Sequence, residues 1–303
     1  MTAQPSVAKL AIEPEEKRIG ISLTQLALRR LRRDRLTLVA LTIVALMALM
    51  SFSAPFISNV LNISYTQTDA TRTFLPVGAE GHPLGTDDLG RDHLARLLYG
   101  GQVSLSVGFL AATVAISIGV TLGIITGFYG GFVDDFTNWV IATLNSIPSL
   151  FLLLIVAAVL QPSPTTLILV LGFLGWTTTT RLVRGETLSL REREYIVSAR
   201  AIGASPLRIM FVHILPNLFS IIVISLAIDI GALILSEAAL SFLGLGIKPP
   251  TPSWGNMLTG AQTYFTRGVH LVILPGLMIF ITVLCLYVIG DGIRDAFDPT
   301  AKD

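Results

Sequence analysis

Two carboxylates stand inside one long apolar run of this sequence, Asp229 and Glu237. A charge at the centre of a bilayer costs about 2.5–3.5 kcal/mol on insertion scales, so Asp229 must face protein or water. It can pair with a neighbouring helix or a partner subunit, or it can line a path for a solute or an ion. Glu237 follows eight residues later, about 80° around a helix, so the two do not share a face closely. We expect Glu237 near the outer end of the run, where snorkelling makes exposure cheap.

Four consecutive threonines close another apolar run, in the stretch GWTTTTRLVRG. Their hydroxyls can return hydrogen bonds to carbonyl groups one turn back, which is a purely structural role. If they face a cavity instead, they can bind a polar solute such as a peptide backbone. With Asp229, the candidate pathway residues are therefore Thr177, Thr178 and Thr180.

The sequence contains no motif typical of a metal-binding or nucleotide-binding site. The acid-rich stretch GTDDLGRD lacks the alternating acids and distant Glu of a calcium loop. The four histidines are scattered, with no pair at ligand spacing on one helix: His82, His93, His213 and His270. None of the four lysines follows a glycine or precedes Ser or Thr, so a P-loop cannot form. We expect no catalytic residue, no metal site and no bound cofactor, and any ATP hydrolysis belongs to a partner.

The composition indicates which elements position these residues. Of 303 residues, 52% are hydrophobic and 14% charged, with a mean hydropathy of +0.72, whereas soluble domains carry about a quarter charged residues. The net charge of +1 gives no indication of a nucleic-acid partner. Six apolar runs are long enough to cross a bilayer as helices, and Pro148 predicts a kink in the third. These runs are 38–57, 103–128, 136–160, 165–180, 218–240 and 271–290.

Basic residues predict the orientation of these spans. The run RRLRRDR precedes the first span, and positive flanks stay in the cytoplasm. Eight Lys and Arg then lie before the first span, six between Arg181 and Arg208 and two after the last, against five on the opposite side. Both termini are expected to be cytoplasmic. The polar leader of more than thirty residues, without a small-x-small cleavage pattern, argues against a signal peptide.

The stretch EYIVSARAIGASPLRIMFVHILPN, between two spans, is then cytoplasmic. Its first nine residues contain no helix breaker, and Gly203 suits the left-handed position that ends a helix. Ser205 and Pro206 suit the N-cap and first turn of a second helix, which Leu215-Pro216 is expected to end. Small side chains on the first helix allow another surface to come close, with Tyr195, Ile196 and Ile202 as apolar anchors. A helix that merely connects two spans at the membrane surface is the alternative.

Several segments together resemble binding-protein-dependent ABC transporter permeases, on the side of the second membrane subunit of dipeptide and oligopeptide systems within the peptide/nickel subfamily. They are HPLGTDDLGRDHLARLLYGGQVSLSVG, LREREYIVSARAIGAS, ALSFLGLGIKPPTPSWGNML and GDGIRDAFDP, and the likeness extends from about residue 26 to 299. The resemblance implies the type I ABC importer permease fold with six transmembrane helices in the cell (inner) membrane. It also implies the substrate class: di- or oligopeptides are the leading candidates, and nickel chelates, glutathione, opines and oligosaccharides are the alternatives.

In that family the cytoplasmic loop is a coupling helix that docks on a cytoplasmic ATPase. By resemblance, residues 194–205 take that role. The family pattern has a Glu where this chain has Val197, so an ion pair there is not carried over, and Glu194 or Arg200 is left to supply the polar contact. The coupling residues are Glu194, Tyr195, Ser198, Ala199, Arg200, Ala201, Gly203, Ala204 and Ser205, with Pro206, Leu215 and Pro216 forming the structural turn.

The outward stretch 59–100 resembles the subfamily's extracytoplasmic insertion. With GIKPPTPSWGN it is expected to form the outer mouth where a substrate-binding protein docks. Trp254 in this second loop is either an interfacial anchor or a docking contact.

The organisation that follows is a cytoplasmic segment 1–36 with a basic juxtamembrane helix, a first transmembrane helix with the insertion (37–100), a permease core with five transmembrane helices (101–291) containing the coupling loop 183–217, and a cytoplasmic tail 292–303. The expected partners are a second homologous permease subunit, two ATPases that bind ATP and Mg²⁺, a substrate-binding protein and the lipid bilayer. An ion-coupled secondary transporter that uses Asp229 is the alternative function.

Overall fold

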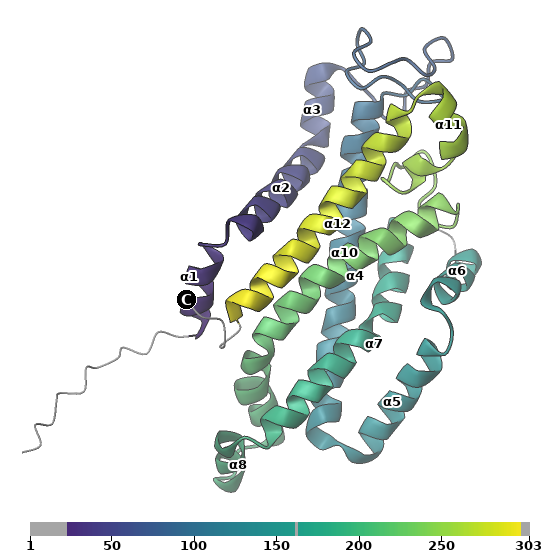
Figure 1. Ribbon diagram of the computed structural model, residues 1–303. Helices are drawn as coiled ribbons and strands as arrows, with labels where there is room; N and C mark the ends of the chain where they lie inside the picture. Colours follow the sequence, from purple (N-terminus) through teal and green to yellow (C-terminus); the bar gives the residue numbers. More distant parts are fainter. Residues whose placement is uncertain (1–22, 161–162, 298–303) are drawn as a thin grey trace, which may run out of the picture.

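The computed structural model describes residues 23–160 and 163–297, and every regular element in these ranges is a helix. Long helices run side by side through most of the molecule, with loops gathered at one end (Figure 1). Five helices are long and apolar enough to cross a bilayer, or six if one bent pair counts as a single span. The predictions of an all-α fold and of about six spans are therefore confirmed.

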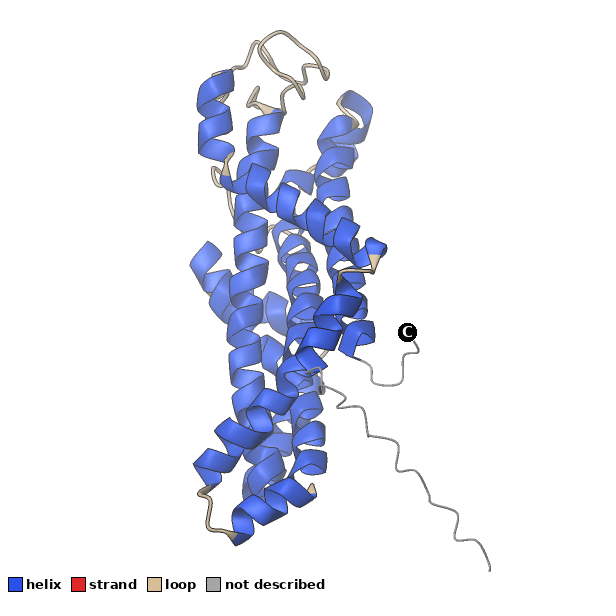
Figure 2. Ribbon diagram, turned by 90° about the vertical axis from the view of Figure 1, so that its left-hand side faces the viewer, coloured by secondary structure: helices blue, strands red, loops and turns tan. Residues whose placement is uncertain are grey.

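Seen from the side, the helices form a long, narrow bundle (Figure 2). In chain order its elements are α1 (Leu23–Leu31), α2 (Arg35–Phe52), α3 (Ala54–Leu61), α4 (His93–Tyr129), α5 (Gly131–Asn145), α6 (Ser149–Val159), α7 (Pro164–Arg191), α8 (Glu194–Ala201), α9 (Pro206–Arg208), the π-helix η1 (Ile209–Ile214), the 3-10 turn η2 (Leu215–Leu218), α10 (Phe219–Phe242), the 3-10 turn η3 (Asn256–Leu258), α11 (Ala261–Arg267) and α12 (His270–Phe297). The α8 helix lies at one end of the bundle, and α3 and α11 lie at the other (Figure 1).

The packing of α4 against α7 depends on three glycines spaced four residues apart, Gly119, Gly123 and Gly127. A Cβ atom at Gly123 would lie 2.7 Å from the Cβ of Val183, and one at Gly127 would lie 2.6 Å from the Cβ of Thr187. Glycine at this spacing lets two backbones approach closely, and van der Waals packing then holds helices together inside a membrane. The spacing is visible in GVTLGIITG, although the sequence reasoning did not use it.

The third predicted span is not one helix. It consists of α5 and α6, which meet at an angle of 83° across the short break that contains Pro148. The kink predicted at Pro148 is confirmed, but the continuous helix over 136–160 is wrong. Because Pro148 has an extended ψ of 126°, it caps α6 from outside the helix and redirects the chain.

Two helix boundaries also differ from the prediction. The α4 helix begins at His93 and not near residue 103, because the Asp92 side chain accepts the backbone N–H of Ala95 at 2.8 Å and caps the helix. In the segment between α7 and α10, Pro216 does not end the second helix of the loop. The wider π-turn of η1 precedes it, so the missing N–H and the proline ring are accommodated, and the chain continues through η2 into α10.

Candidate functional site

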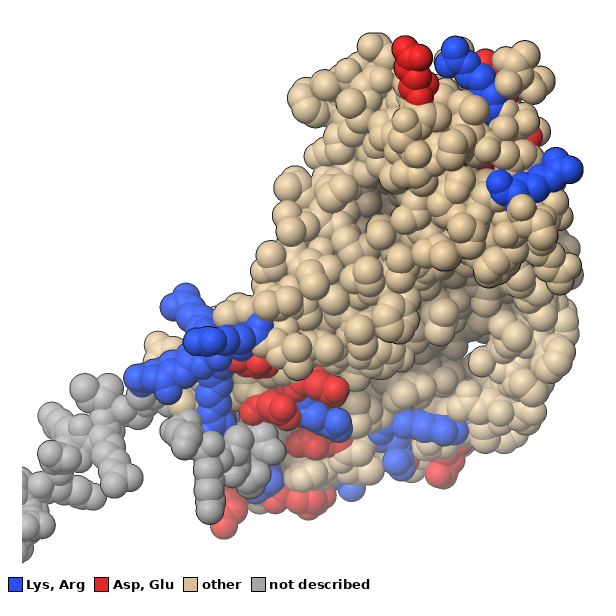
Figure 3. Space-filling model, turned by 45° about the horizontal axis from the view of Figure 1, so that its top comes forward, with Lys and Arg blue, Asp and Glu red and all other residues tan. Residues whose placement is uncertain are grey.

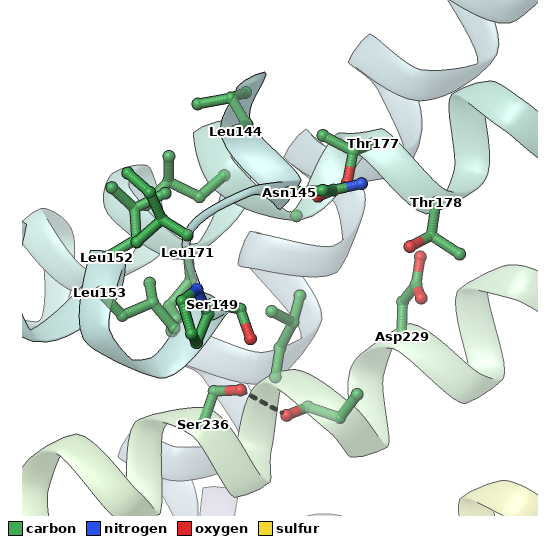
Figure 4. Close-up of a pocket in the computed structure, with 16 residues that line it drawn as sticks. Leu144, Asn145, Ser149, Leu152, Leu153, Leu171, Thr177, Thr178, Asp229 and Ser236 are labelled. Atoms are coloured by element: carbon green, nitrogen blue, oxygen red, sulfur yellow. Dashed lines mark hydrogen bonds between the residues drawn. The ribbon is translucent and has the colours of Figure 1, made fainter. Parts of the chain in front are cut away.

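A cavity of about 450 Å³ opens between α5, α6, α7 and α10. Figure 4 shows Thr177 and Thr178 entering it from α7, Asp229 from α10 and Asn145 from the end of α5. Leucine side chains form much of the remaining wall. The break between α5 and α6 borders this space, since Asn145, Pro148 and Ser149 are lining residues. The polar lining residues are Asn145, Ser149, Thr177, Thr178, Asp229 and Ser236.

Asp229 both lines the cavity and bonds to a neighbouring helix. Its Oδ2 accepts a hydrogen bond of 3.1 Å from the hydroxyl of Thr179 on α7. In the described part of the chain no Lys or Arg pairs with it. The two interpretations offered for Asp229 are therefore not exclusive: one oxygen is held by α7 while the side chain borders the cavity.

Some of the four threonines line the cavity, and others have the structural role of bonding within or between helices. Thr177 and Thr178 line the cavity, and the Thr177 hydroxyl lies 3.5 Å from the Oδ1 atom of Asn145. Thr180 was predicted as a pathway residue and is not: it is fully buried and donates to the carbonyl of Trp176 at 3.0 Å. Successive positions on a helix are separated by 100°, so four adjacent side chains cannot all face one cavity.

At the far end of the same bundle, α8 projects from the molecule and ends in a glycine turn. Gly203 has φ of +87°, the left-handed region that favours glycine. The N–H of Ala204 donates to the carbonyl of Ala199 at 3.0 Å, and that of Gly203 to Arg200 at 3.1 Å. These two bonds form a Schellman motif, which satisfies carbonyls at the end of a helix. Ser205 then caps the next turn through the N–H of Arg208 at 3.4 Å.

One face of α8 is anchored and the other is free. Ile196 was expected to be an exposed anchor, but it is fully buried and belongs to a core cluster with Val183 of α7 and Ile209 of η1. Ala199 is also buried, so it faces the body and not a partner. The remaining predicted coupling residues are exposed except for the half-buried Ala204: Glu194, Tyr195, Ser198, Arg200, Ala201, Gly203 and Ser205.

An ion pair that the sequence reasoning missed braces this end of the bundle. Arg184 of α7 donates two hydrogen bonds to the carboxylate of Asp134 on α5, the Nη2 bond measuring 2.5 Å. Nearby, Arg191 donates to the carbonyl of Gly127 at the end of α4 at 3.0 Å. A paired Arg fork on a carboxylate fixes orientation as well as distance. The α7 helix, which leads into α8, is thus joined to α5 through Arg184 and to α4 through Arg191.

The segment between α3 and α4 folds around Asp87. Its carboxylate accepts from the backbone N–H of Leu89 and of Arg91, both at 2.9 Å, and from the Arg91 guanidinium at 2.8 Å. Arg96 of α4 approaches the same carboxylate at 3.0 Å. The acids in this stretch thus hold the loop onto α4. The phenol of Tyr264 on α11 bonds to neighbouring Asp88, and burial together with that acid raises its pKa to about 12.

The loop 246–256 folds back into the molecule. Trp254 is 1% exposed and its indole N–H donates to the carbonyl of Leu97 at 3.0 Å. Neither role expected for Trp254 is correct, because a buried ring can be neither an interfacial anchor nor a docking contact. Glu237 is also corrected: it is 0% exposed and hydrogen-bonded to serines, so it does not snorkel.

On the face shown in Figure 3, charged side chains lie at the two ends of the bundle. In the face shown in Figure 3, a broad band between the ends displays no Lys, Arg, Asp or Glu. A basic group marks the end that holds α1, where several arginines are exposed: Arg29, Arg32, Arg33 and Arg35. A band without charge between charged ends is what a bilayer-spanning chain requires.

Comparison with known proteins gives two family matches. Residues 119–303 match the family described as binding-protein-dependent transport system inner membrane component. Residues 22–76 match the N-terminal TM domain of oligopeptide transport permease C. Residues 77–118, which include most of α4, lie between the two matches.

Curated relatives cover nearly the whole chain. The dipeptide transport system permease protein DppC of Alkalihalophilus pseudofirmus is 36% identical over 302 residues, 100% of this chain and 97% of the relative. The oligopeptide transport system permease protein OppC of Escherichia coli K12 is 38% identical over 92% of each chain. The glutathione transport system permease protein GsiD of Salmonella typhimurium is 41% identical over 90% of this chain and 89% of the relative.

Among solved structures, a chain from inward-facing conformations of the MetNI methionine ABC transporter superposes with a TM-score of 0.52 at 19% identity. The match covers 66% of this chain and 96% of that one. At this identity the likeness concerns the fold.

Proposed function

This chain belongs to the family of binding-protein-dependent transport system inner membrane components and is therefore a multi-pass membrane transport subunit and not an enzyme; from that premise we propose that it forms half of the path through which an ATP-driven importer moves di- or oligopeptides. The alternative of an ion-coupled secondary transporter built on Asp229 has no support from these relatives. Two of them are named for dipeptides and oligopeptides and a third for glutathione, itself a short peptide.

The cavity chemistry supports a peptide-like solute. A peptide offers backbone amides, one ammonium group and side chains of varied polarity. Thr177, Thr178 and Asn145 provide hydroxyl and amide groups that can bond to a backbone, and Asp229 provides a negative charge for an ammonium group. The leucine walls tolerate varied side chains because apolar contact does not require one geometry. Selection among peptides then belongs to the substrate-binding protein.

The observation that carries the proposal is the rigid connection between the free face of α8 and the cavity wall. Ile196 of α8 and Val183 of α7 share one buried cluster, and α7 also carries Thr178 into the cavity. Five residues separate Val183 from Thr178, a rise of about 8 Å along one helix. A displacement of α8 by an attached ATPase therefore moves the cavity wall with it, because packed helices transmit motion as rigid bodies.

The assembly we propose contains a second homologous permease subunit, two cytoplasmic ATPases and an extracytoplasmic binding protein. ATP and Mg²⁺ bind in the ATPases, and α8 with the turn 202–206 docks on one of them. The end that holds α1 and α8 is cytoplasmic in this arrangement, as its exposed arginines favour, and α3, α11 and the outer segment face outward. Closure of the ATPases on ATP then shifts the permease pair from inward-open to outward-open.

The test is reconstitution of the complex that copurifies with this chain, followed by uptake of a labelled dipeptide and by ATPase activity. Replacement of the exposed Ala201 by Trp is expected to release the ATPases or to abolish uptake. Ala158→Trp is the matched control, because Ala158 is also exposed but lies on α6, far along the chain from the loop. If the chain purifies alone and moves solute with a proton gradient, the proposal is wrong.

A further inference from the structure

Glu237 is the most completely enclosed carboxylate in the described part of the chain, with 0% exposure, and no Lys or Arg accompanies it. Glu237 is not among the residues that line the cavity, and it points about 80° away from Asp229 around α10. A buried carboxylate is costly unless hydrogen bonds surround it. Its partners therefore indicate its purpose.

Three serine hydroxyls surround this carboxylate. Ser104 of α4 donates to Oε2 at 3.0 Å, and Ser241 of α10 donates to Oε1 at 2.7 Å. Ser253, in the loop 246–256, is the third hydrogen-bond partner of the carboxyl group. Each of these bonds reaches Glu237 from a different element: α4, α10 and the loop.

Two of the same serines also accept a backbone N–H from the loop. The Ile247 N–H donates to the Ser241 oxygen at 3.0 Å, and the Trp254 N–H donates to the Ser104 oxygen at 3.2 Å. A hydroxyl has one proton and two lone pairs, so a serine can accept from the loop while it donates to Glu237. Glu237 thereby holds both ends of the loop through intermediate hydroxyls. Chains of this kind polarise one another and strengthen each bond.

Two glycines let the loop pack closely against α10. A Cβ atom at Gly246 would lie 2.5 Å from the backbone N of Ser241. One at Gly255 would lie 2.8 Å from the carbonyl oxygen of Ala238. The loop backbone thus rests directly on α10, and the buried Trp254 fixes it to α4.

A neighbouring side of α10 borders the cavity. Ser236, adjacent to Glu237, is a lining residue, and so is Asp229 two turns earlier. The same stretch of α10 therefore binds the loop 246–256 through Glu237 and contributes Asp229 and Ser236 to the cavity wall. Any displacement of the loop that moves Glu237 also moves Ser236.

We propose that Glu237 is a positioning residue that locks the loop 246–256 to α10, and that docking of the binding protein at the outer mouth reaches the cavity wall through this lock. The inference rests on the proposed function, since it requires a binding protein that docks there. It predicts that the lock affects the response to the binding protein and leaves the basal turnover of the ATPases intact.

The first measurement is the stimulation of ATPase activity by substrate-loaded binding protein, with the full complex in lipid nanodiscs. Glu237→Ala and Ser104→Ala are expected to lower the stimulation ratio about fivefold for each hydrogen bond that the substitution removes, with unchanged basal activity. Glu237→Gln is expected to give a stimulation ratio between those of the wild type and Glu237→Ala, because its amide nitrogen faces a serine hydroxyl that must reorient to accept a hydrogen bond. Ser106→Ala is the matched control: it removes a partly exposed serine two residues from Ser104 on the same helix.

The second measurement reports the loop itself. A spin label at Lys248→Cys, an exposed loop position, is expected to become more mobile in the Glu237→Ala background and to stay immobile in the Ser106→Ala background. The native Cys285 is buried and does not compete for the label.

The outcomes separate the two proposals. Equal stimulation in wild type and in all three lock variants, or an unchanged label, overturns this inference alone. Loss of basal activity in every lock variant also overturns it, because Glu237 would then only support folding. If the binding protein fails to stimulate the wild-type complex, the proposed function falls and this inference falls with it.

Discussion

Replacement of Gly203 by valine tests whether the shape of the α8 turn, and not its bulk, couples the ATPases to transport. Gly203 has φ of +87°, and a Cβ atom built there would meet no heavy atom within 4 Å. Steric collision with residues 23–160 and 163–297 is therefore absent. The penalty arises within the residue, since a left-handed conformation costs an L-residue about 1–2 kcal/mol and a β-branched one is a genuine outlier there.

The size of the effect follows from that penalty. At about 2 kcal/mol the native turn loses about 30-fold in population relative to alternatives in which the Schellman bonds from Gly203 and Ala204 are broken. The core under α8 stays in place because Ile196 remains buried. We therefore expect normal membrane insertion, ATP hydrolysis that no longer depends on substrate, and uptake reduced by at least about tenfold.

The assay compares uptake of a labelled dipeptide with ATP hydrolysis in proteoliposomes at matched protein levels. Gly203→Asn is the control, because asparagine tolerates the left-handed region while adding a side chain of similar size to valine. If the turn conformation matters, Asn retains coupling and Val does not. Normal uptake in Gly203→Val at normal expression would refute the reasoning, and equal loss in both variants would point to surface bulk instead of the backbone.

Three further predictions concern the positions that the fold brings together. Gly123→Ala is expected to lower the free energy of unfolding by about 1–3 kcal/mol, because its Cβ would lie 2.7 Å from the Cβ of Val183. Gly185→Ala is the control and is expected to be neutral or stabilising, because no described heavy atom lies within 4 Å of its Cβ. Thermal unfolding in detergent compares the two variants. A double-mutant cycle with Asp134→Asn and Arg184→Gln should give a coupling free energy of about 1–3 kcal/mol, and additive effects would show that the ion pair stabilises nothing. Asp229→Asn should raise the KM for a dipeptide with little change in unstimulated ATPase activity, and an unchanged KM would remove Asp229 from the pathway.

Local patterns in the sequence predicted the turns and the spans correctly where a single segment decides the structure. Gly203 and Ser205 take the cap positions expected of them, and Pro148 breaks its span. These outcomes depend on backbone preferences of one or two residues, so neighbours along the chain suffice to read them. The helix end predicted at Pro216 was wrong, because the preceding π-turn accommodates the proline ring, and residue spacing does not reveal a π-turn.

The site itself depended on contacts between distant segments. Asp134 and Arg184 are 50 residues apart, and Ser104 and Glu237 are 133 apart. Sequence identified Asp229 and Glu237 as unusual because charge is rare in a span, but it could not assign partners to them. It also placed Ile196 and Ala199 on the docking face of α8, whereas both face the core.

The sequence alone thus determined that this chain spans a membrane, that the chain bends at Pro148 and that a glycine turn follows α8, because each depends on hydrophobicity or backbone preference summed over neighbouring residues. Only the tertiary structure decided that Thr177 and Asp229 border a common cavity, while Thr180 and Glu237 are enclosed by other helices. The physical reason is that helix rotation and pairing are set by which surfaces pack most closely, as at the glycines of α4. That packing depends on residues far apart in the chain.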